Sequence, residues 1–313
     1  MNILVTGAGG QLATEIKAQT VLWNTDNHYF YTTHKELPIA DENAVNDYIA
    51  KNSINVIVNC AAYTAVDKAD DTDELLKVMS ANAVGPKVLA AAAKKNDATL
   101  IHVSTDYVFD GKSNIPYKPN MPTFPQNVYG HSKLNGEIFI QDSGCKYIIL
   151  RTSWLYSPYG KNFVKNMYNL MKKKDTIKVV MDQVGSPTYA ADLANFITDI
   201  IETDKLSNVG IYHFSNLGVA SWYDLTMAIK DYACDFCYDR MEHDEGEEYE
   251  GINCDVKPCT SDEFPTPVKR PNYSVLDTQS LRETFGYDIP YWRRSLKLCI
   301  EEIILSENPI EKE

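Results

Sequence analysis

The sequence predicts an α/β protein in which helices cover both faces of a parallel β-sheet. Short, continuously apolar segments alternate with helical segments over the first 150 residues, and strands buried on both faces have this uninterrupted apolar character. A glycine-rich turn joins the first apolar segment to the first helix, which is the usual connection at the first strand of a doubly wound sheet.

The individual elements follow from this alternation. We expect strands at residues 3–5, 28–33, 56–58, 100–103, 147–150 and 211–214. We expect helices at residues 11–22, 41–51, 74–95 and 190–202 and from about residue 222. The second half is less regular and contains most of the proline-containing loops, as in a smaller lobe built from insertions.

Length, charge and termini restrict the possible functions. The chain has 313 residues, 44% of them hydrophobic, and a formal net charge of −13. Such a chain forms one large or two unequal domains, and it lacks the basic face that nucleic acids or a polybasic membrane contact require. We therefore expect no nucleic-acid or membrane partner. Neither a signal-peptide pattern nor a membrane-length apolar run is present, which predicts a cytoplasmic protein.

Seven cysteines are scattered along the chain, and four of them could be considered for a zinc site. Cys234 and Cys237 form one close pair, while Cys254 and Cys259 are spaced more widely. No histidine accompanies them at ligand spacing, so we favour reduced thiols without a metal.

The turn after the first strand has the composition of a phosphate-binding loop. Gly7, Gly10, Gln11 and Leu12 lie where backbone N–H groups at a helix start face a dinucleotide pyrophosphate. Glycines let the backbone approach the phosphates closely. The sequence therefore predicts a Rossmann-type dinucleotide-binding domain over residues 1–150, to which parts of 175–215 return. Residues 151–313 would mainly form a substrate-binding lobe.

The end of the second strand indicates which nicotinamide cofactor binds. An acid at this position holds the ribose 2′-OH of NADH, whereas a basic residue accommodates the 2′-phosphate of NADPH. The chain has Thr33, His34 and Lys35 here, with no acid before Glu36. This favours NADPH and leaves NADH possible.

A tyrosine and a lysine four residues apart form a candidate acid-base pair. Tyr129 and Lys133 would lie on one face of a helix, where the ammonium could lower the pKa of the phenol. Ser104 and Thr105 directly follow a parallel strand, so a hydroxyl there could bind the same substrate oxygen. Together they predict proton donation to a carbonyl as hydride reaches its carbon.

These motifs together resemble the extended short-chain dehydrogenase/reductases, and the branch that reduces dTDP-activated 4-keto-sugars in particular. The similarity covers nearly the whole chain, and its motifs lie at residues 7–13, 59–69, 104–111, 129–133, 151–156, 182–188 and 270–277.

The resemblance implies a role for each matching position. Tyr129 would be the proton donor, Lys133 would orient the nicotinamide ribose, and Thr105 would bind the keto oxygen. Further cofactor contacts are implied for Ile39, Ala62, Tyr63 and Thr64. Contacts with the nucleotide-sugar substrate are implied for Asp106 and Trp154, and an arginine fork such as that of Arg270 suits its diphosphate.

Several alternatives remain open at this point. The chain could reduce or epimerise another nucleotide-activated keto-sugar, or it could be a non-catalytic NADP-binding regulatory subunit. The intact set of Thr105, Tyr129 and Lys133 favours catalysis. Some relatives dimerise around Mg²⁺ through acids near the first helix, but Glu15 does not belong to a complete ligand set here. We expect a monomer or homodimer, with residues 239–250 as an acidic surface insertion.

Overall fold

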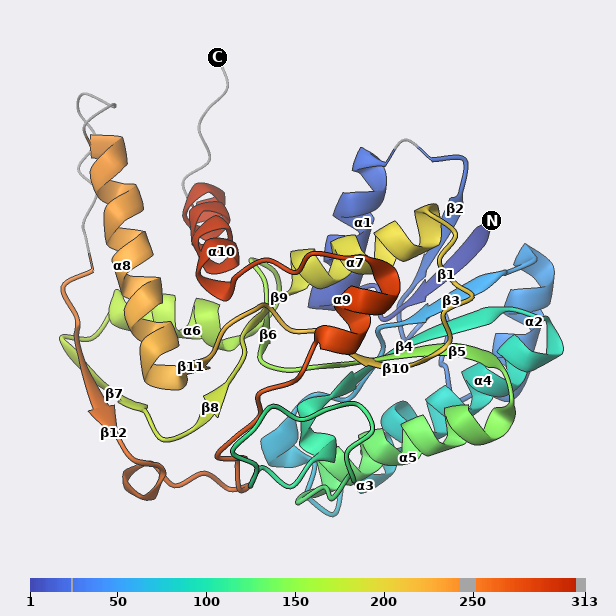
Figure 1. The fold of residues 1–313 in the computed structure, drawn as a ribbon, viewed down its shortest axis with the longest axis horizontal. Coiled ribbons are helices and arrows are strands. Elements are labelled where there is room, and N and C mark those ends of the chain that lie inside the picture. The colour runs from blue at the N-terminus through green and yellow to red at the C-terminus, as the bar shows by residue number, and fades with distance from the viewer. Residues whose placement is uncertain (24, 242–251, 308–313) are drawn as a thin grey trace.

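A six-stranded parallel sheet forms the centre of the larger part of the molecule (Figure 1). The computed structural model describes residues 1–23, 25–241 and 252–307. The strands are β1 (Asn2–Thr6), β2 (His28–Thr32), β3 (Val56–Asn59), β4 (Thr99–Thr105), β5 (Lys146–Thr152) and β10 (Gly210–His213). Their order is β10-β5-β4-β3-β1-β2, and every neighbouring pair is parallel. The order reverses between β1 and β3, which confirms the predicted doubly wound fold.

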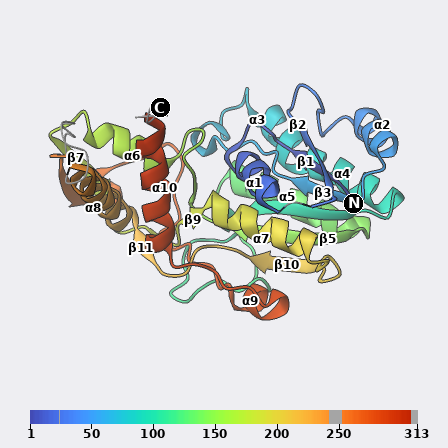
Figure 2. The ribbon, with the colours of Figure 1, turned by 90° about the horizontal axis from the view of Figure 1, so that it is seen from above.

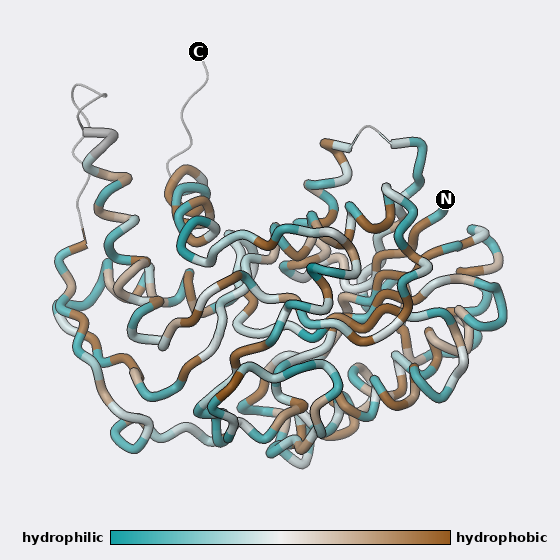
Figure 3. Tube along the Cα trace, viewed as in Figure 1, coloured by the Kyte–Doolittle hydropathy of each residue, from teal (hydrophilic) through white to brown (hydrophobic). Residues whose placement is uncertain are grey.

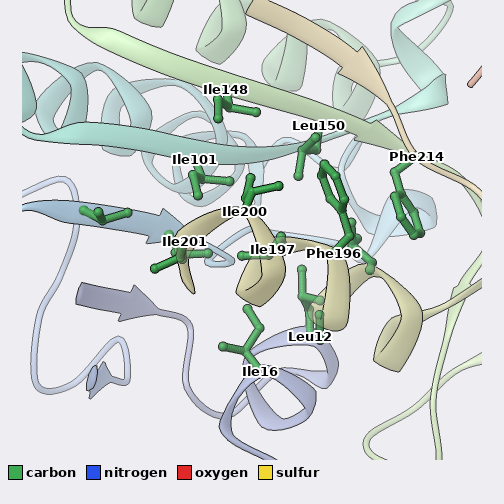
Figure 4. Packing of buried hydrophobic residues seen from close by; sticks show 14 of the residues in the cluster. Leu12, Ile16, Ile101, Ile148, Leu150, Phe196, Ile197, Ile200, Ile201 and Phe214 are labelled. Atoms are coloured by element: carbon green, nitrogen blue, oxygen red, sulfur yellow. The ribbon is translucent and has the colours of Figure 1, made fainter. Parts of the chain in front are cut away.

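Helices cover both faces of this sheet because successive strand residues point to opposite sides. On one face, α1 (Gln11–Leu22) and α7 (Ala190–Glu202) pack against Ile3, Ile101 and Ile148, as Figure 4 shows for several of these side chains. On the other face, α2 (Glu42–Asn52), α4 (Gly85–Lys95) and α5 (Val128–Ser143) pack against Leu4, Ile57 and Leu100. Hydrophobic residues accordingly concentrate along the strands and on the inward faces of the helices (Figure 3).

A second hydrophobic core lies beside the sheet, and Figure 2 shows the helices that form it, α6 (Phe163–Met171), α8 (Trp222–Met241) and α10 (Trp292–Glu307), next to the sheet. The parallel pair of β7 (Thr176–Val180) and β12 (Asp255–Cys259) also contributes to it. The remaining short elements are β6 (Leu155–Tyr156), β8 (Val184–Gly185), β9 (Thr188–Tyr189), β11 (Ala220–Ser221) and α9 (Gln279–Phe285). Between residues 175 and 215, β7 contributes to this second core, whereas α7 and β10 lie with the sheet.

The segment predicted as one helix over residues 74–95 is divided. It consists of α3 (Leu75–Met79), a π-helical turn η2 (Ser80–Val84) and then α4. Pro86 explains the wider turn, because it lacks the N–H that would bond to the carbonyl of Asn82 and its ring crowds that carbonyl. The bounds predicted for the helices at 11–22 and 190–202 are confirmed.

Other expectations concern the acidic segment, metals and membranes. Helix α8 continues to Met241, so residues 239–241 of the predicted acidic loop are helical, and residues 242–251 lie outside the described part. Within the described residues, no cluster of three or more His, Cys, Asp or Glu side chains could hold a metal ion. All seven cysteines are free thiols, and no helix in the described ranges is both long and apolar enough to cross a bilayer.

One buried carboxyl on α1 makes the stability of the fold depend on pH. Glu15 is 4% exposed, and its Oε1 atom has no hydrogen-bond partner among the described residues. Burial, with further contributions from Glu302 and Asp192, raises the pKa of Glu15 to about 7. The folded protein therefore holds this proton over a pH range in which the unfolded chain has released it.

We predict that Glu15→Gln removes a pH-dependent loss of stability. The wild-type free energy of unfolding should fall as the pH rises from about 4, near the unfolded pKa, to about 7, and this contribution should stay constant above that. The glutamine variant should be more stable than the wild type at pH 8, by roughly 1 to 3 kcal/mol. Urea denaturation at pH 5 and pH 8 measures this, with Glu42→Gln on the exposed start of α2 as the control. Equal pH dependence of Glu15→Gln and wild type would contradict it.

Candidate active site

Helix α5 carries the predicted acid-base pair. The helix begins at Asn127, whose side chain accepts a hydrogen bond from the backbone N–H of Gly130 (2.8 Å), and it ends at Gly144 in a left-handed conformation. Tyr129 and Lys133 are both buried, at 9% and 2% exposure. They lie four residues apart and therefore on one face of the helix, as predicted.

Two glycines let α5 approach its neighbours closely. A Cβ atom on Gly130 would collide with the backbone carbonyl of Tyr107, and one on Gly136 would collide with that of Asn82 in η2. Any side chain at either position would push the helix away from these segments. The two glycines thus set the depth at which Tyr129 and Lys133 lie.

A buried ion pair holds the same helix against the sheet. Glu137, one turn beyond Lys133, accepts hydrogen bonds from Nη2 (2.7 Å) and Nε (3.0 Å) of Arg151 on β5. Its carboxylate also accepts a hydrogen bond from the Ser104 hydroxyl near the end of β4. Both charged residues are at most 3% exposed. This pair was not predicted from the sequence, although Glu137 continues the four-residue spacing of Tyr129 and Lys133.

Lys133 is held on the side of β4. Its ammonium donates a hydrogen bond to the carbonyl oxygen of Val103 (2.7 Å) and lies 3.5 Å from Nε2 of His102. Burial lowers the pKa of Lys133 to about 8, although Glu137 and Cys60 act in the opposite direction. The group can therefore change protonation state near neutral pH.

The pKa of Tyr129 does not follow the sequence-based expectation. We expected Lys133 to lower it, but burial raises the pKa of the Tyr129 phenol, and its interaction with the Thr105 hydroxyl only partly offsets this. The physical reason is that the lysine ammonium is directed to the Val103 carbonyl while the phenol packs edge-to-face against the ring of Tyr107. Tyr129 consequently stays protonated at neutral pH.

The end of β4 adds a hydroxyl and a carboxyl group. Thr105 caps the short 3₁₀ turn η3 (Asp106–Val108), accepting a hydrogen bond from the N–H of Tyr107 (3.2 Å) and donating one to Oδ1 of Asp106 (3.0 Å). Burial raises the pKa of Asp106 to about 7. Its buried Oδ2 atom has no hydrogen bond of normal geometry among the described residues, although the Ser274 hydroxyl is near enough to lower the pKa of the carboxyl. Such an unsatisfied oxygen costs about 1 to 3 kcal/mol, which a ligand hydroxyl could recover.

A cleft of about 740 Å³ opens at the glycine-rich turn. Gly7 has φ of +72°, and a Cβ atom there would come within 2.8 Å of the Ala61 backbone, so glycine is required. Of the predicted cofactor-binding residues outside α5, seven line the cleft: Gly7, Gly10, Thr33, His34, Ile39, Ala62 and Tyr63. The size of the cleft and the start of α1 at its edge suit a dinucleotide.

Asn82 connects this cleft to α5 and was not predicted from the sequence. Its side-chain oxygen accepts a hydrogen bond from the N–H of Tyr63 (2.8 Å). Its amide nitrogen donates to the carbonyl of Tyr63 and to the hydroxyl of Ser132, each at 3.0 Å. The π-helical turn that carries Asn82 therefore fixes one wall of the cleft relative to Tyr129.

Six predicted cofactor residues have side chains outside the lining of this cleft, and two of them, Tyr129 and Lys133, lie on α5. Gln11 points toward the smaller lobe, where its Oε1 atom accepts hydrogen bonds from Ser157 (3.1 Å) and Asn162 (2.8 Å). Leu12 is buried in the core beneath α1. Lys35 and Thr64 are exposed.

Trp154 and Arg270, both predicted to bind substrate, already have partners within the protein. The indole of Trp154 stacks on Trp222 at the start of α8, with ring centroids 3.5 Å apart and planes 7° from parallel. Its backbone has φ of +49°, an unfavourable value for a bulky residue. Arg270 pairs with Asp67 (2.5 Å) and donates a hydrogen bond to the hydroxyl of Tyr107 (3.2 Å).

Three features occur together here: a glycine-rich cleft after β1, a hydroxyl at the end of β4, and a buried Tyr-x-x-x-Lys pair on α5. This combination is typical of the NAD(P)H-dependent oxidoreductases of the extended short-chain type. The family model described as "RmlD substrate binding domain" matches residues 1–305, so the chain belongs to this family. This confirms the resemblance inferred from the sequence.

Individual relatives are similar over almost the whole chain. A dTDP-4-dehydrorhamnose reductase of Aggregatibacter actinomycetemcomitans is 38% identical over 94% of this chain and 97% of its own. The crystal structure of such a reductase from Clostridium acetobutylicum has a TM-score of 0.86 and 41% identity, covering 97% of this chain and 100% of that one. A Bacillus anthracis reductase solved in complex with NADP has a TM-score of 0.85 and 35% identity, covering 96% and 99%.

We predict that Glu137→Gln destabilises the fold by about 3 to 5 kcal/mol, because it leaves the Arg151 guanidinium buried without a counter-charge. The free energy of unfolding in urea measures this. Asp97→Asn, which breaks the exposed pair between Asp97 and Lys146, is the matched control and should have a far smaller effect. A Glu137→Gln variant as stable as the control would show that the pair does not anchor α5.

Proposed function

We propose that this chain catalyses the NADPH-dependent reduction of the C4 ketone of dTDP-4-dehydro-β-L-rhamnose to dTDP-L-rhamnose. The observation that carries the proposal is the convergence of Tyr129, Thr105 and Asp106 at the end of β4. All three groups are buried, and Tyr129 packs in one cluster with Tyr63, which lines the glycine-rich cleft. The names of the relatives and the NADP in one of their structures support the same activity.

The residues of the cleft fit a nicotinamide dinucleotide. Gly7 and Gly10 leave room for a pyrophosphate beside the N-terminus of α1, and Ile39 offers an apolar contact for the adenine. Ala62 and Tyr63 lie toward the end of β3, where the second ribose would bind. When bound, the reduced nicotinamide supplies the hydride for the ketone carbon.

The protein supplies the proton. Tyr129 would donate a hydrogen bond to the ketone oxygen, and Thr105 would do the same by redirecting the hydroxyl hydrogen that now points to Asp106. As the carbonyl π bond breaks and hydride adds to carbon, the Tyr129 O–H bond breaks and its proton moves to the oxygen, which gives the alcohol. The raised pKa of Tyr129 ensures that this proton is present at neutral pH. Solvent later restores the proton to the phenolate.

Lys133 and Asp106 support this step. Lys133 uses one N–H bond for the Val103 carbonyl, which leaves its other donors for a ribose hydroxyl of the cofactor. Oδ2 of Asp106 is available for a hydroxyl of the deoxysugar. Trp154 stays the residue that we expect to contact the sugar, although its indole already stacks on Trp222 and lies close to Gly185. The cytoplasmic location and the monomeric or homodimeric state expected from the sequence stay predictions.

We predict that Tyr129→Phe lowers turnover by about 10²- to 10⁴-fold, the usual contribution of a positioned proton donor, and leaves NADPH binding nearly unchanged. The loss of NADPH absorbance is followed while the upstream enzymes supply the dTDP-keto-sugar. Tyr168→Phe, which removes a buried hydroxyl from the second core, serves as the control.

Three outcomes of this assay would contradict parts of the proposal. Wild-type turnover by Tyr129→Phe would exclude Tyr129 as the donor. Faster turnover of another nucleotide keto-sugar would reassign the substrate. NADPH binding without turnover of any such sugar would favour a regulatory subunit.

A further inference from the structure

The carboxylate of Glu36 lies beside Thr33, which directly follows β2 and lines the cofactor cleft. Its Oε2 atom accepts a hydrogen bond from the backbone N–H of Thr33 and another from the Thr33 hydroxyl, both at 2.8 Å. The chain turns back at this point, since Leu37 donates its N–H to the carbonyl of Thr33 (3.0 Å). An anion is thus already bound by the two donors of Thr33.

These two donors lie in the part of the cleft that faces the adenosine end of a dinucleotide. Thr33 and His34 line the cleft together with Ile39. The preceding residue, Thr32, accepts a hydrogen bond from the N–H of Ala8, so the end of β2 is fixed against the glycine-rich turn. In doubly wound folds, the groups at this strand end contact the ribose 2′ position.

From this geometry we infer that Glu36 is a specificity-determining residue that weakens the binding of NADPH relative to NADH. The inference rests on the cofactor site of the proposed function. A 2′-phosphate would have to displace the carboxylate from both donors of Thr33 and would then lie beside its negative charge. A 2′-hydroxyl needs no such displacement and can donate a hydrogen bond to the same carboxylate.

The charges around Glu36 act in both directions. Hydrogen bonds from Thr33, first the backbone N–H and then the hydroxyl, lower the pKa of Glu36, so it is ionised at neutral pH. Exposed His34 and Lys35 next to it favour a phosphate. Glu36 therefore weakens the attraction that His34 and Lys35 exert on a 2′-phosphate. The chain should accept both cofactors, with a smaller preference for NADPH than His34 and Lys35 alone would produce.

Direct binding measurements test this without any sugar substrate. Dissociation constants of NADPH and NADH are measured by calorimetry for the wild type and for Glu36→Gln, which keeps the shape of the side chain and removes its charge. We expect NADPH to bind about three to ten times more tightly to Glu36→Gln, as for the loss of one repulsive surface charge. NADH binding should stay the same or weaken, and added salt should reduce the difference.

Two further variants make the result decisive. Glu42→Gln removes an equivalent exposed charge from the start of α2 and should leave both constants unchanged. Glu36→Ala should shift the NADPH-to-NADH ratio in the same direction as Glu36→Gln. An unchanged ratio in both Glu36 variants, or an equal change for both cofactors, would overturn the inference. A wild-type protein that binds neither cofactor would overturn the proposed function as well.

Discussion

The ion pair between Glu137 and Arg151 fixes the helix that carries the proposed catalytic groups Tyr129 and Lys133. It is buried between α5 and the sheet, and Ser104 adds a hydrogen bond to the carboxylate from the strand that ends in Thr105. One contact therefore joins the helix of Tyr129 and Lys133 to the two strands beneath it. Charges so far from water are stabilising only while both partners remain, which makes the position of α5 sensitive to either one.

The same exclusion of water adjusts the protonation of the site. It raises the pKa of Tyr129 and of Asp106 and lowers that of Lys133, because in each case the charged form loses hydration. The phenol thus retains its proton at neutral pH, whereas the carboxyl of Asp106 and the amine of Lys133 can each change protonation state near it. Burial of the site therefore keeps a proton available for the substrate oxygen in the proposed reduction.

Much of this architecture could be predicted from local sequence patterns. The apolar segments located the strands, the glycine turn located one end of the cleft, and the Tyr-x-x-x-Lys spacing located the candidate acid-base pair. Contacts between distant segments could not be predicted in this way. The pairing of Glu137 with Arg151, the bridge from Asn82 to Tyr63, and the stack of Trp222 on Trp154 each depend on the folded topology. The pKa of Tyr129 also depends on burial, which no spacing specifies.

The glycines of α5 limit how this protein can be stabilised or altered. Gly130 and Gly136 each weaken the helix by up to about 1 kcal/mol relative to alanine, yet alanine would collide with a backbone carbonyl at both positions. The usual stabilising substitution of helical glycine by alanine would therefore destabilise the protein at these two positions. Stabilising substitutions would have to come from the exposed face of α5 or from other elements, and variants selected for thermal resistance should retain both glycines.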